Sequence, residues 1–360
     1  MNHSVRILQL IDSLETGGAE RMAINYANTL AEVIPLSALV TTRKEGALKE
    51  QLSDKVTYLF LNKKGRLGLS AVLRLRKFIL QHKINVIHAH STSFFTAILV
   101  KLLYPKVRIV WHDHNGNRVH TKGAMNKTLK WSSLLFWGVL TVNQELEKWS
   151  KQNLHTQNTQ YFPNFIPTTK SEVMSETFLK GEKGKRIVFL ANLRKPKNHL
   201  QVLKAFAASQ ATNLGWTLHL IGNDYSDDYS ETLKDFILKN DLQDAIFIYN
   251  SRNDIEHILN QANIGILGST YEGFPVTLLE YGMANLCVLS TQVGYCKDII
   301  QDSKSGLLFS PDNLSEITDK LNCALLSKTD RINYAYALNS FVMDNYTDKV
   351  IIDNYLDWLG

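Results

Sequence analysis

The sequence predicts an α/β protein made of two doubly wound domains. Short apolar runs alternate with amphipathic helical patterns along the whole chain, and this alternation is typical of parallel sheets covered by helices. The pattern occurs in two successive sets of about six strands, and a chain of 360 residues is long enough for two domains of ordinary size. Ligands of such sheets bind outside the carboxyl ends of the strands. With two such sheets facing each other, we expect the ligand site in the cleft between them.

The first domain is expected to span residues 1–168. Its strand-like runs are residues 5–11, 36–42, 56–61, 85–89, 107–111 and 138–141. Helical patterns lie between several of these runs, at residues 19–31, 69–81, 92–103 and 122–136. A turn with two prolines, Pro163 and Pro167, closes the domain, and the polar stretch that follows it has no strand signal.

The second domain is expected to span residues 185–330. Its strand-like runs are residues 186–190, 217–221, 245–249, 263–267, 286–290 and 306–309. The helical patterns between them are residues 200–208, 229–238, 254–260, 276–283 and 314–326. The remaining segment, 331–360, is helical in pattern, and we expect it to pack back onto the first domain.

Composition narrows the environment of the protein. We find no secretory signal pattern and no apolar run of the roughly 18 to 20 residues that span a bilayer. The three cysteines, Cys287, Cys296 and Cys323, are odd in number and lack metal-ligand spacing, which indicates a reducing compartment and no disulfide framework. We therefore expect a cytoplasmic protein.

The charge is divided unevenly between the two halves. Residues 1–166 hold 22 Lys and Arg against 10 Asp and Glu, and the remainder holds 18 against 24. In the helical pattern 69–81, Arg74, Arg76 and Lys77 alternate with apolar residues. Such a face favours an anionic membrane surface, here the inner face of the membrane, at about 1 kcal/mol per cation. A solvated basic face is the alternative, and nucleic acid is not expected because no nucleic-acid motif accompanies the charge.

The most informative motif is the stretch Ser269–Glu280, which follows the strand-like run 263–267. Glu272 lies in the turn after the strand, Pro275 is predicted at the first helical position, and Glu280 lies inside the helix. A helix N-terminus offers free N–H groups and a partial positive charge, which suit a phosphate. Two flanking carboxylates can bond sugar hydroxyls, so the motif suits a sugar attached to a phosphate. The alternative is a dipole partner and a solvated face.

Polar and glycine residues follow other strands. Gly17 and Gly18 open a helix after the first strand, and they lack the G-x-G-x-x-G pattern of dinucleotide binding. His112 and His114 end another strand of the first domain. No further ligand set accompanies them, so we predict contacts to sugar hydroxyls or phosphate oxygens and no metal site. Three strands of the second domain are also followed by candidate ligand contacts. Arg194 and Lys197 follow the first of these strands and suit a diphosphate. Gly222 follows the next and would let a nucleotide lie close, and Tyr249 ends the one after and could meet a base.

Taken together, these features resemble the GT-B glycosyltransferases, specifically the family-4 group of retaining enzymes, also described as glycosyl transferases group 1. The resemblance covers nearly the whole chain and is densest in residues 186–310. The matching residues are Gly17–Glu20, His112, Pro163–Asn164, Arg194–Asn198, Leu220–Gly222, Glu272–Glu280, Val293–Gly294, Ile299–Ile300 and Gly306–Leu308. It implies two Rossmann-like domains facing across a cleft and a glycosyltransferase of the hexosyltransferase type.

The resemblance also implies residue roles. Glu272 would bond the hydroxyls of the donor sugar, and Glu280 would bond the ribose. Arg194 and Lys197 would neutralise the departing nucleoside diphosphate, a large catalytic contribution because charge develops there. His112 would contact the transferred sugar, with His114 competing for that role. The donor would also meet backbone groups of Phe274, Pro275, Val276 and Thr277 from the second domain, and Gly17 and Gly18 from the first.

This chain departs from the family pattern at two places. The family often has Gly-Arg where this chain has Ala191-Asn192, so the arginine role would pass to Arg194. The helix after Glu280 continues Tyr281-Gly282-Met283 rather than the more usual Ala-Met-Ala.

The expected reaction moves a sugar, with retention, from a nucleotide-sugar donor to a glycan or lipid-linked glycan in surface polysaccharide biosynthesis. UDP is the expected donor nucleotide on family frequency, and the departing phosphate would help to deprotonate the acceptor. No metal and no separate cofactor are expected. Two alternatives stay open: a GT-B nucleotide-sugar epimerase, and a non-catalytic sugar-nucleotide-binding partner of a glycosyltransferase complex.

Overall fold

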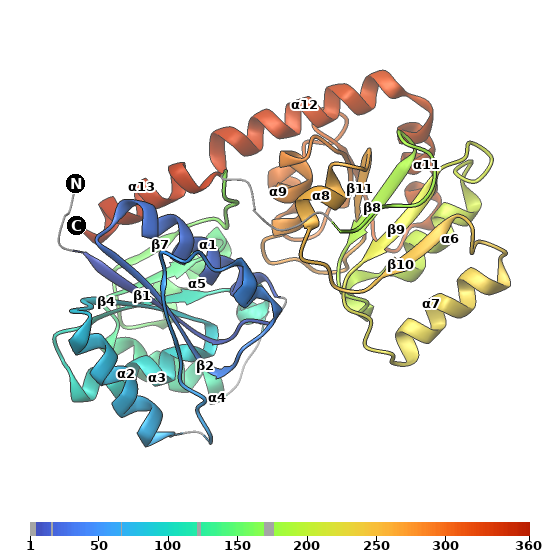
Figure 1. Ribbon diagram of the computed structural model, residues 1–360. Coiled ribbons are helices and arrows are strands. Elements are labelled where there is room, and N and C mark those ends of the chain that lie inside the picture. Colours follow the sequence, from blue (N-terminus) through green and yellow to red (C-terminus); the bar gives the residue numbers. More distant parts are fainter. Residues whose placement is uncertain (1–4, 16, 66, 121–123, 169–175) are drawn as a thin grey trace. The chain divides into compact units, whose positions relative to one another are not determined.

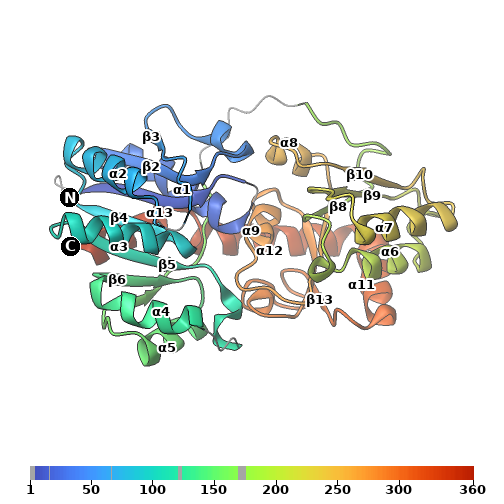
Figure 2. The same cartoon turned by 90° about the horizontal axis from the view of Figure 1, so that it is seen from below.

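The protein is described by a computed structural model, which covers residues 5–15, 17–65, 67–120, 124–168 and 176–360. The chain divides into two compact units. Unit 1 consists of Met1–Lys170 and Thr347–Gly360, and unit 2 consists of Ser171–Tyr346. Each unit holds one parallel sheet covered by helices on both faces (Figures 1 and 2). The predicted α/β class with two Rossmann-like domains is therefore confirmed.

Unit 1 contains a sheet of seven parallel strands in the order β3-β2-β1-β4-β5-β6-β7. The strands are β1 (Arg6–Ser13), β2 (Leu36–Lys44), β3 (Thr57–Phe60), β4 (Val86–His90), β5 (Arg108–Asp113), β6 (Gly138–Thr141) and β7 (Thr159–Tyr161). The central strands are buried along nearly their whole length. This accounts for their near-continuous apolar runs, because helices cover both faces.

The helices of unit 1 cover the two faces of this sheet in separate groups. Helices α1 (Gly18–Val33) and α13 (Asp348–Leu359) share one apolar core, and α2 (Leu69–Gln81), α3 (Phe94–Leu103), α4 (Ala124–Ser132) and α5 (Gln144–Asn153) contribute to the core on the other face. Consecutive residues of one strand enter different cores: Ile7 packs with α1 and α13, whereas Leu8 packs with α2 and α3. The period-two alternation of a strand therefore decides which helices each residue meets.

Two elements of unit 1 are absent from the sequence prediction. Strand β7 is only three residues long and lies at the edge of the sheet, and its Thr-Gln-Tyr sequence gives no apolar run. Helix α5 is strongly polar but well capped, because the Asn143 side chain accepts a hydrogen bond from the Leu146 amide. Short edge strands and polar helices carry weak periodicity, which explains both omissions.

Unit 2 contains a sheet of six parallel strands in the order β10-β9-β8-β11-β12-β13. All six correspond to predicted strands: β8 (Arg186–Leu190), β9 (Thr217–Ile221), β10 (Ile246–Tyr249), β11 (Ile264–Leu267), β12 (Cys287–Thr291) and β13 (Leu307–Phe309). On one face, α6 (His199–Ala208), α7 (Asp228–Lys239) and α11 (Leu314–Leu326) share the main apolar core with the sheet. The remaining helices are α8 (Ile255–Leu259), α9 (Val276–Met283), α10 (Cys296–Ile299) and α12 (Lys328–Asn345).

The C-terminal segment predicted at 331–360 is divided between the two units. Helix α12 begins at Lys328 and belongs to unit 2, and the chain enters unit 1 at Thr347. Helix α13 then packs on the unit 1 core through apolar residues that include Tyr355. Its first residue, Asp348, accepts hydrogen bonds from the amide and hydroxyl of Thr168. The part of the segment that packs on the first domain is therefore α13.

None of the helices within the described ranges combines the length and the apolar character that crossing a membrane requires.

Candidate active site

The strand order of unit 2 creates a topological switch point between β8 and β11. The chain builds outward from β8 to β10, and then builds from β11 to β13 on the other side. Ligands of open parallel sheets bind at the carboxyl ends of the strands where the order reverses. The loops that leave this point touch each other, because the Thr270 amide donates to the Pro196 carbonyl oxygen at 2.8 Å. A ligand at the switch point would meet both loops.

An ion pair between Lys197 and Glu272 joins the two loops. Lys197 Nζ lies 2.6 Å from Glu272 Oε1, and the Ser269 hydroxyl donates to the same oxygen at 2.6 Å. The Glu272 side chain is 11% exposed and that of Lys197 is 32% exposed, so solvent reaches the pair. Both contacts use Oε1, which leaves Oε2 able to accept hydrogen bonds from ligand hydroxyls. The switch point therefore presents a cation beside a carboxylate.

Helix α9 spans the predicted residues 276–283, but Pro275 does not occupy its first position. Pro275 was predicted at the first helical position, but the helix starts at Val276 and Pro275 precedes it with φ −82° and ψ 89°. No side chain caps this end, and the Val276 amide donates to the Phe274 carbonyl oxygen at 3.1 Å. Within the described residues the amides of Phe274 and Thr277 have no partner. These two groups can therefore bind an anion.

Tyr281 fixes α9 against the sheet at the switch point. Its side chain is fully buried, and its hydroxyl accepts from the Leu190 amide at 2.8 Å and lies 3.1 Å from the Ile266 carbonyl oxygen. Strands β8 and β11 are paired only up to Val188 and Gly265, so the hydroxyl replaces the ladder hydrogen bonds where the strands part. A Cβ at Gly265 would lie 2.5 Å from the Tyr281 ring. The glycine in the strand makes room for the tyrosine in the helix.

The departure from the family pattern at Tyr281-Gly282 thus has a structural reason. Gly282 lets α12 approach α9 closely, since a Cβ there would lie 2.7 Å from a Val342 methyl carbon. Asn339 of α12 also donates to the Gly282 carbonyl oxygen at 2.9 Å. The helix that carries Glu280 is therefore held from the sheet side by Tyr281 and from the α12 side by Gly282.

Two further glycines allow close approach of backbone segments. Gly294, which follows β12, has φ +51°, and a Cβ there would lie 1.8 Å from the Glu272 carbonyl oxygen. Gly222, which follows β9, would place a Cβ 2.2 Å from the Ala191 carbonyl oxygen. Gly294 thus supports the loop that carries Glu272. Gly222 is used for contact with the end of β8, a role that the sequence analysis did not foresee.

The other predicted side chains of unit 2 have different surroundings. The Arg194 guanidinium lies 4.7 Å from the Tyr225 ring centroid and donates to the Tyr225 hydroxyl. The Tyr249 hydroxyl lies 3.3 Å from His219 Nδ1 and 3.4 Å from the Lys180 amide nitrogen. Glu280 lies in the second turn of α9 and is half-buried. In the described part of the chain, neither Arg194 nor Tyr249 forms a hydrogen bond or ion pair with Glu272.

In unit 1, the Gly17–Gly18 turn precedes and opens α1. A Cβ on Gly17 would lie 2.3 Å from a Glu20 carboxyl oxygen, whereas one on Gly18 would meet no described atom within 4 Å. The Ser13 hydroxyl lies 3.4 Å from the other Glu20 oxygen, and burial raises the pKa of Glu20. The Glu20 carboxyl therefore occupies the space beside Gly17. Gly18 is the glycine that a ligand can approach.

Four histidine rings lie at the ends of β4 and β5, and we call them the histidine quartet: His88, His90, His112 and His114. His88 Nε2 lies 3.1 Å from His112 Nδ1, and His90 Nδ1 lies 2.9 Å from His114 Nε2. The first three rings are fully buried, while His114 is half-buried. Of the two histidines predicted from the sequence, His112 thus has no exposed surface and His114 has some.

Burial keeps the quartet neutral. It lowers the pKa of His88, His90 and His112 well below the usual value and that of His114 to about 3. His90 Nε2 lies 2.8 Å from the Gln9 side-chain oxygen, which can only accept, so His90 carries its proton there. His90 Nδ1 must then accept from His114 Nε2. This leaves His114 Nδ1 as the ring nitrogen that can accept a hydrogen bond from a ligand.

The ligand atoms of His88, His90 and His112 all lie within 4.8 Å of one another, a spacing that invites a metal assignment. The rings of His88 and His90, however, are stacked, with centroids 4.4 Å apart and an interplanar angle of 16°. A histidine binds a metal in the plane of its ring, and the lone pairs of two stacked rings lie in separate, nearly parallel planes, so one ion cannot lie in both. Convergence on one ion would require a ring to rotate within a packed core.

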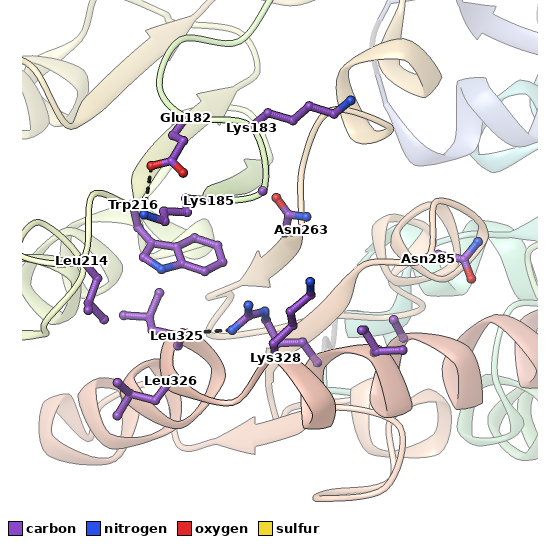
Figure 3. A pocket seen from close by; sticks show the side chains of 14 residues that line it. Glu182, Lys183, Lys185, Leu214, Trp216, Asn263, Asn285, Leu325, Leu326 and Lys328 are labelled. Atoms are coloured by element: carbon purple, nitrogen blue, oxygen red, sulfur yellow. Dashed lines mark hydrogen bonds and ion pairs between the residues drawn. The ribbon is translucent and has the colours of Figure 1, made fainter.

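A cavity of about 570 Å³ in unit 2 lies away from this chemistry (Figure 3). It is lined by residues that precede β8, β9 and β11, including Lys185, Trp216 and Asn263, and by Lys328 and Arg331 of α12. These residues mark the amino edge of the sheet, opposite the switch point. The carboxyl edge, where ligands of parallel sheets bind, therefore remains the candidate active site.

The sequence patterns predicted no role for several residues of the site. Ser269 lies three residues before Glu272, a spacing at which a hydroxyl can reach the turn. His88 and His90 show the same alternate spacing at a strand end as His112 and His114, so that pattern could have found them. Tyr225 and Tyr281 gave no local signal, because their partners lie 31 and 91 residues away in the sequence.

Two family models match the chain in succession. Residues 16–170 match the model described as Glycosyltransferase Family 4, and residues 170–338 match the model described as Glycosyl transferases group 1. Together they include all the predicted site residues.

Relatives and solved structures agree with these matches. The chain is 22% identical over 339 residues, 89% of each chain, to a Campylobacter jejuni enzyme named GalNAc-α-(1->4)-GalNAc-α-(1->3)-diNAcBac-PP-undecaprenol α-1,4-N-acetyl-D-galactosaminyltransferase. It is 19% identical to the Xanthomonas oryzae pv. oryzae GDP-mannose:cellobiosyl-diphosphopolyprenol α-mannosyltransferase, over 76% of this chain and 73% of that one. Its fold resembles that of Anabaena HepE in complex with UDP and glucose, with a TM-score of 0.80, 17% identity and 99% of both chains covered. This chain belongs to the family-4 glycosyltransferases of the GT-B fold.

Proposed function

We propose that this glycosyltransferase moves a sugar, with retention of anomeric configuration, from a UDP-sugar to a glycan or lipid-linked glycan of surface polysaccharide biosynthesis. The observation that carries the proposal is the Lys197–Glu272 ion pair at the switch point of unit 2. A nucleotide sugar presents a diphosphate beside a sugar ring with hydroxyls. A cation beside a half-occupied carboxylate matches both parts of such a donor.

In the proposed mechanism, Lys197 turns from Glu272 toward the diphosphate as the donor binds. The amides of Phe274 and Thr277 and the guanidinium of Arg194 add further donors to the phosphate oxygens. Charge that develops on the departing diphosphate is then stabilised by groups already in place, which is usually the largest catalytic contribution. Glu272, freed from Lys197, accepts hydrogen bonds from the sugar hydroxyls, and Glu280 bonds the ribose. No metal takes part in this proposal.

We further propose that His114, rather than His112, takes the sugar contact in unit 1. His112 is fully buried behind the rest of the quartet, whereas His114 reaches the surface and has Nδ1 available to accept. The buried rings hold the tautomer and orientation of His114 through His90. His112 then acts as a packing partner, with its ring 4.0 Å from that of His114.

The acceptor and membrane parts of the proposal rest on the relatives and on the surface of unit 1. The names of two relatives describe glycans linked by diphosphate to undecaprenol or another polyprenol. Apolar side chains are exposed on α2, α3 and α4, three of the helices on one face of the unit 1 sheet, among them Leu73, Leu102 and Trp131. The cations Lys77 and Lys130 lie on the same helices and are exposed. Apolar and cationic groups together suit an anionic membrane surface.

The test is a thermal-shift titration of the protein with UDP and GDP, followed by an assay for UDP release from UDP-sugars. We expect UDP to raise the melting temperature more than GDP, because the proposal names UDP. We also expect UDP release to increase when a membrane extract that contains lipid-linked glycans is added. A larger shift with GDP would contradict the donor assignment.

The same assay separates transfer from the two alternatives. An epimerase acts without an acceptor, so a new free nucleotide sugar in the absence of extract would favour it. A non-catalytic partner would bind UDP without releasing it from any donor. Sugar recovered in the lipid fraction with the donor's anomeric configuration would support retention, and the opposite configuration would contradict it.

A further inference from the structure

A lysine of unit 1 is buried without an opposite charge. Five charged residues in the described ranges are buried: Lys63, Asp113, Arg118, Asp254 and Asp348. Asp113 and Arg118 form an ion pair, Asp254 accepts from the amides of Glu176 and Thr177, and Asp348 accepts from Thr168. Within those ranges Lys63, at 6% exposure, has no carboxylate within ion-pair distance. Buried charges in proteins are normally paired, so this exception calls for an explanation.

Lys63 is held firmly at the carboxyl edge of the unit 1 sheet. It follows β3, and its amide donates to the Thr42 carbonyl oxygen at 2.6 Å. Its ammonium donates to the Thr96 hydroxyl at 2.9 Å and lies 5.7 Å from the Phe95 ring centroid. Gly68 packs against its aliphatic stem, because a Cβ there would lie 2.6 Å from Lys63 Cγ. The ammonium has three donors and one of them is used in this way.

The surroundings of Lys63 hold an excess of positive charge. Burial and the neighbouring Arg43 lower the pKa of Lys63, and Asp12 raises it. Asp12 is already engaged, since its two oxygens accept from the Thr42 and Thr92 hydroxyls and Arg43 Nε lies 3.9 Å from one of them. Two cations thus lie near one carboxylate whose oxygens already accept hydrogen bonds from threonine hydroxyls. An oxyanion placed between Lys63 and Arg43 would relieve this imbalance.

We propose that Lys63 and Arg43 form an acceptor subsite that binds a phosphate group of the acceptor, and this proposal rests on the proposed glycosyl transfer. A phosphate suits the pair because it spreads its charge over several oxygens, which can bridge an ammonium and a guanidinium. The Thr96 hydroxyl beside Lys63 can supply a further hydrogen bond.

The position of the subsite favours the acceptor over the donor. Lys63 contacts residues of α3, which covers the face of the sheet shared with α2 and α4. Gly18, which is proposed to meet the donor, opens α1 on the other face. The face of α2, α3 and α4 is also the one proposed to meet the membrane. The diphosphate of a lipid-linked glycan would therefore enter from the side on which Lys63 lies.

The test measures binding of inorganic pyrophosphate by calorimetry to the full-length protein saturated with UDP. Saturation with UDP fills the donor site, so pyrophosphate reports on the remaining subsite. We expect Lys63→Met to weaken pyrophosphate binding about tenfold or more while the affinity for UDP stays unchanged. The matched control is Lys55→Met, an exposed lysine of unit 1 paired with Glu32, which should bind pyrophosphate as the unaltered protein does.

Folding is checked separately for each variant. Lys63→Met keeps the length of the stem and removes an unpaired buried charge, so its melting temperature should be equal or higher. Arg43→Gln is the second variant, since Arg43 is half-exposed and its loss leaves the core intact. It should also weaken pyrophosphate binding. Equal affinity for pyrophosphate in all variants, or no binding by the unaltered protein, would overturn the subsite.

A parallel titration with glucuronate distinguishes a phosphate from the carboxylate of an acidic sugar. Binding of glucuronate that depends on Lys63, without binding of pyrophosphate, would contradict the phosphate assignment. The UDP affinity of the unaltered protein is measured in the same series. A protein that binds UDP and transfers sugar equally well with Lys63 or Met at this position refutes the subsite alone, whereas loss of UDP binding in the unaltered protein contradicts the proposed donor.

Discussion

The carboxyl edges of the two sheets are built from opposite kinds of chemistry. The edge in unit 2 is organised around the Lys197–Glu272 ion pair, which is partly exposed to solvent. The edge in unit 1 is organised around the neutral histidine quartet and, on the other face of the sheet, a buried lysine without a carboxylate partner. The first six strands of unit 1 and the six strands of unit 2 follow the same order along their sheets, so the difference lies in the side chains that the strands and their loops carry.

This difference indicates how each edge can respond to a ligand. In unit 2 the charges neutralise each other, and a diphosphate can exchange for Glu272 at Lys197 without leaving a buried charge unpaired. In unit 1 the histidines cannot take up a proton at low cost, so they can only orient groups. Lys63, by contrast, would gain a partner that it lacks. We therefore expect the ion pair of unit 2 to rearrange when a ligand binds, and the histidine quartet of unit 1 to orient the ligand without changing its own charge.

The largest expected effect concerns pH and separates the units. The folded-state pKa of each quartet histidine is lowered, so the unfolded chain binds protons at a higher pH than the folded chain. Stability is therefore full above the unfolded pKa of about 6.5 and is lost as pH falls below it, by up to about 1.4 kcal/mol per histidine per pH unit. Unit 2 has two such histidines, His199 and His219, with pKa values lowered to about 4 and 3.

Hydrogen exchange between pH 7.5 and 5.5 measures this difference unit by unit. As the pH falls, amides of β4 and β5 should lose protection before those of β8 and β9, because protonation of four buried histidines destabilises unit 1 and that of two destabilises unit 2. Equal loss in both sheets would show that the quartet does not titrate as its burial requires.

The next effect concerns the ion pair. Glu272→Gln keeps the shape of the side chain but removes its charge, so Lys197 loses its partner and the donor sugar loses a charged acceptor. We expect transfer to fall about 100-fold to 1000-fold, with an unchanged melting temperature. Turnover of UDP-sugar measures the change. The control is Glu182→Gln at the opposite edge of the same sheet, beside the cavity of Figure 3, which should not alter turnover.

The support beneath Glu272 can be tested with a pair of glycines. Gly294→Ala should destabilise the protein by about 1–3 kcal/mol and reduce transfer about 10-fold to 100-fold, because its Cβ must displace the Glu272 carbonyl. Gly184→Ala is the matched control, with φ +96° and no described atom within 4 Å of the new Cβ. Thermal unfolding and turnover are compared for both variants. Similar losses would mean that the backbone angle, rather than the contact with Glu272, sets the cost.

Tyr281→Phe tests the contact that replaces the ladder between β8 and β11. The partly buried Leu190 amide would lose its acceptor, at a cost of about 1–3 kcal/mol in the free energy of unfolding. Urea unfolding measures this cost. Tyr336→Phe, on an exposed ring of α12, serves as the control and should leave stability unchanged. A stable Tyr281→Phe variant would contradict the bridging role of the hydroxyl.

The smallest expected effect concerns the surface of unit 1. Trp131→Glu replaces an exposed apolar ring of α4 with a negative charge, and it should reduce binding to anionic vesicles severalfold, by about 1–2 kcal/mol. Co-sedimentation measures vesicle binding. Leu238→Glu, which changes an exposed apolar residue of α7 in unit 2, should bind vesicles as the unaltered protein does. If both variants bind vesicles equally well, the proposal that this surface of unit 1 meets the membrane is wrong.

The sequence by itself determined the alternation of strands and helices, and with it the two-domain α/β class. It also determined the positions of Glu272, Glu280 and the cations after β8, because these features depend on local spacing. Periodicity and short motifs are set by neighbouring residues, so they survive without knowledge of the fold. Elements with weak local patterns, such as β7 and α5, were not predicted.

Only the tertiary structure decided which of those residues meet. Lys197 and Glu272 are 75 residues apart and pair because β8 and β11 are neighbours in the sheet. Tyr281 fits because β11 has a glycine opposite it, and Lys63 is buried because Gly68 and α3 close over it. Burial and long-range contact depend on strand order, which no local window of sequence contains. For that reason the ion pair, the quartet and the unpaired lysine became visible only in the folded chain.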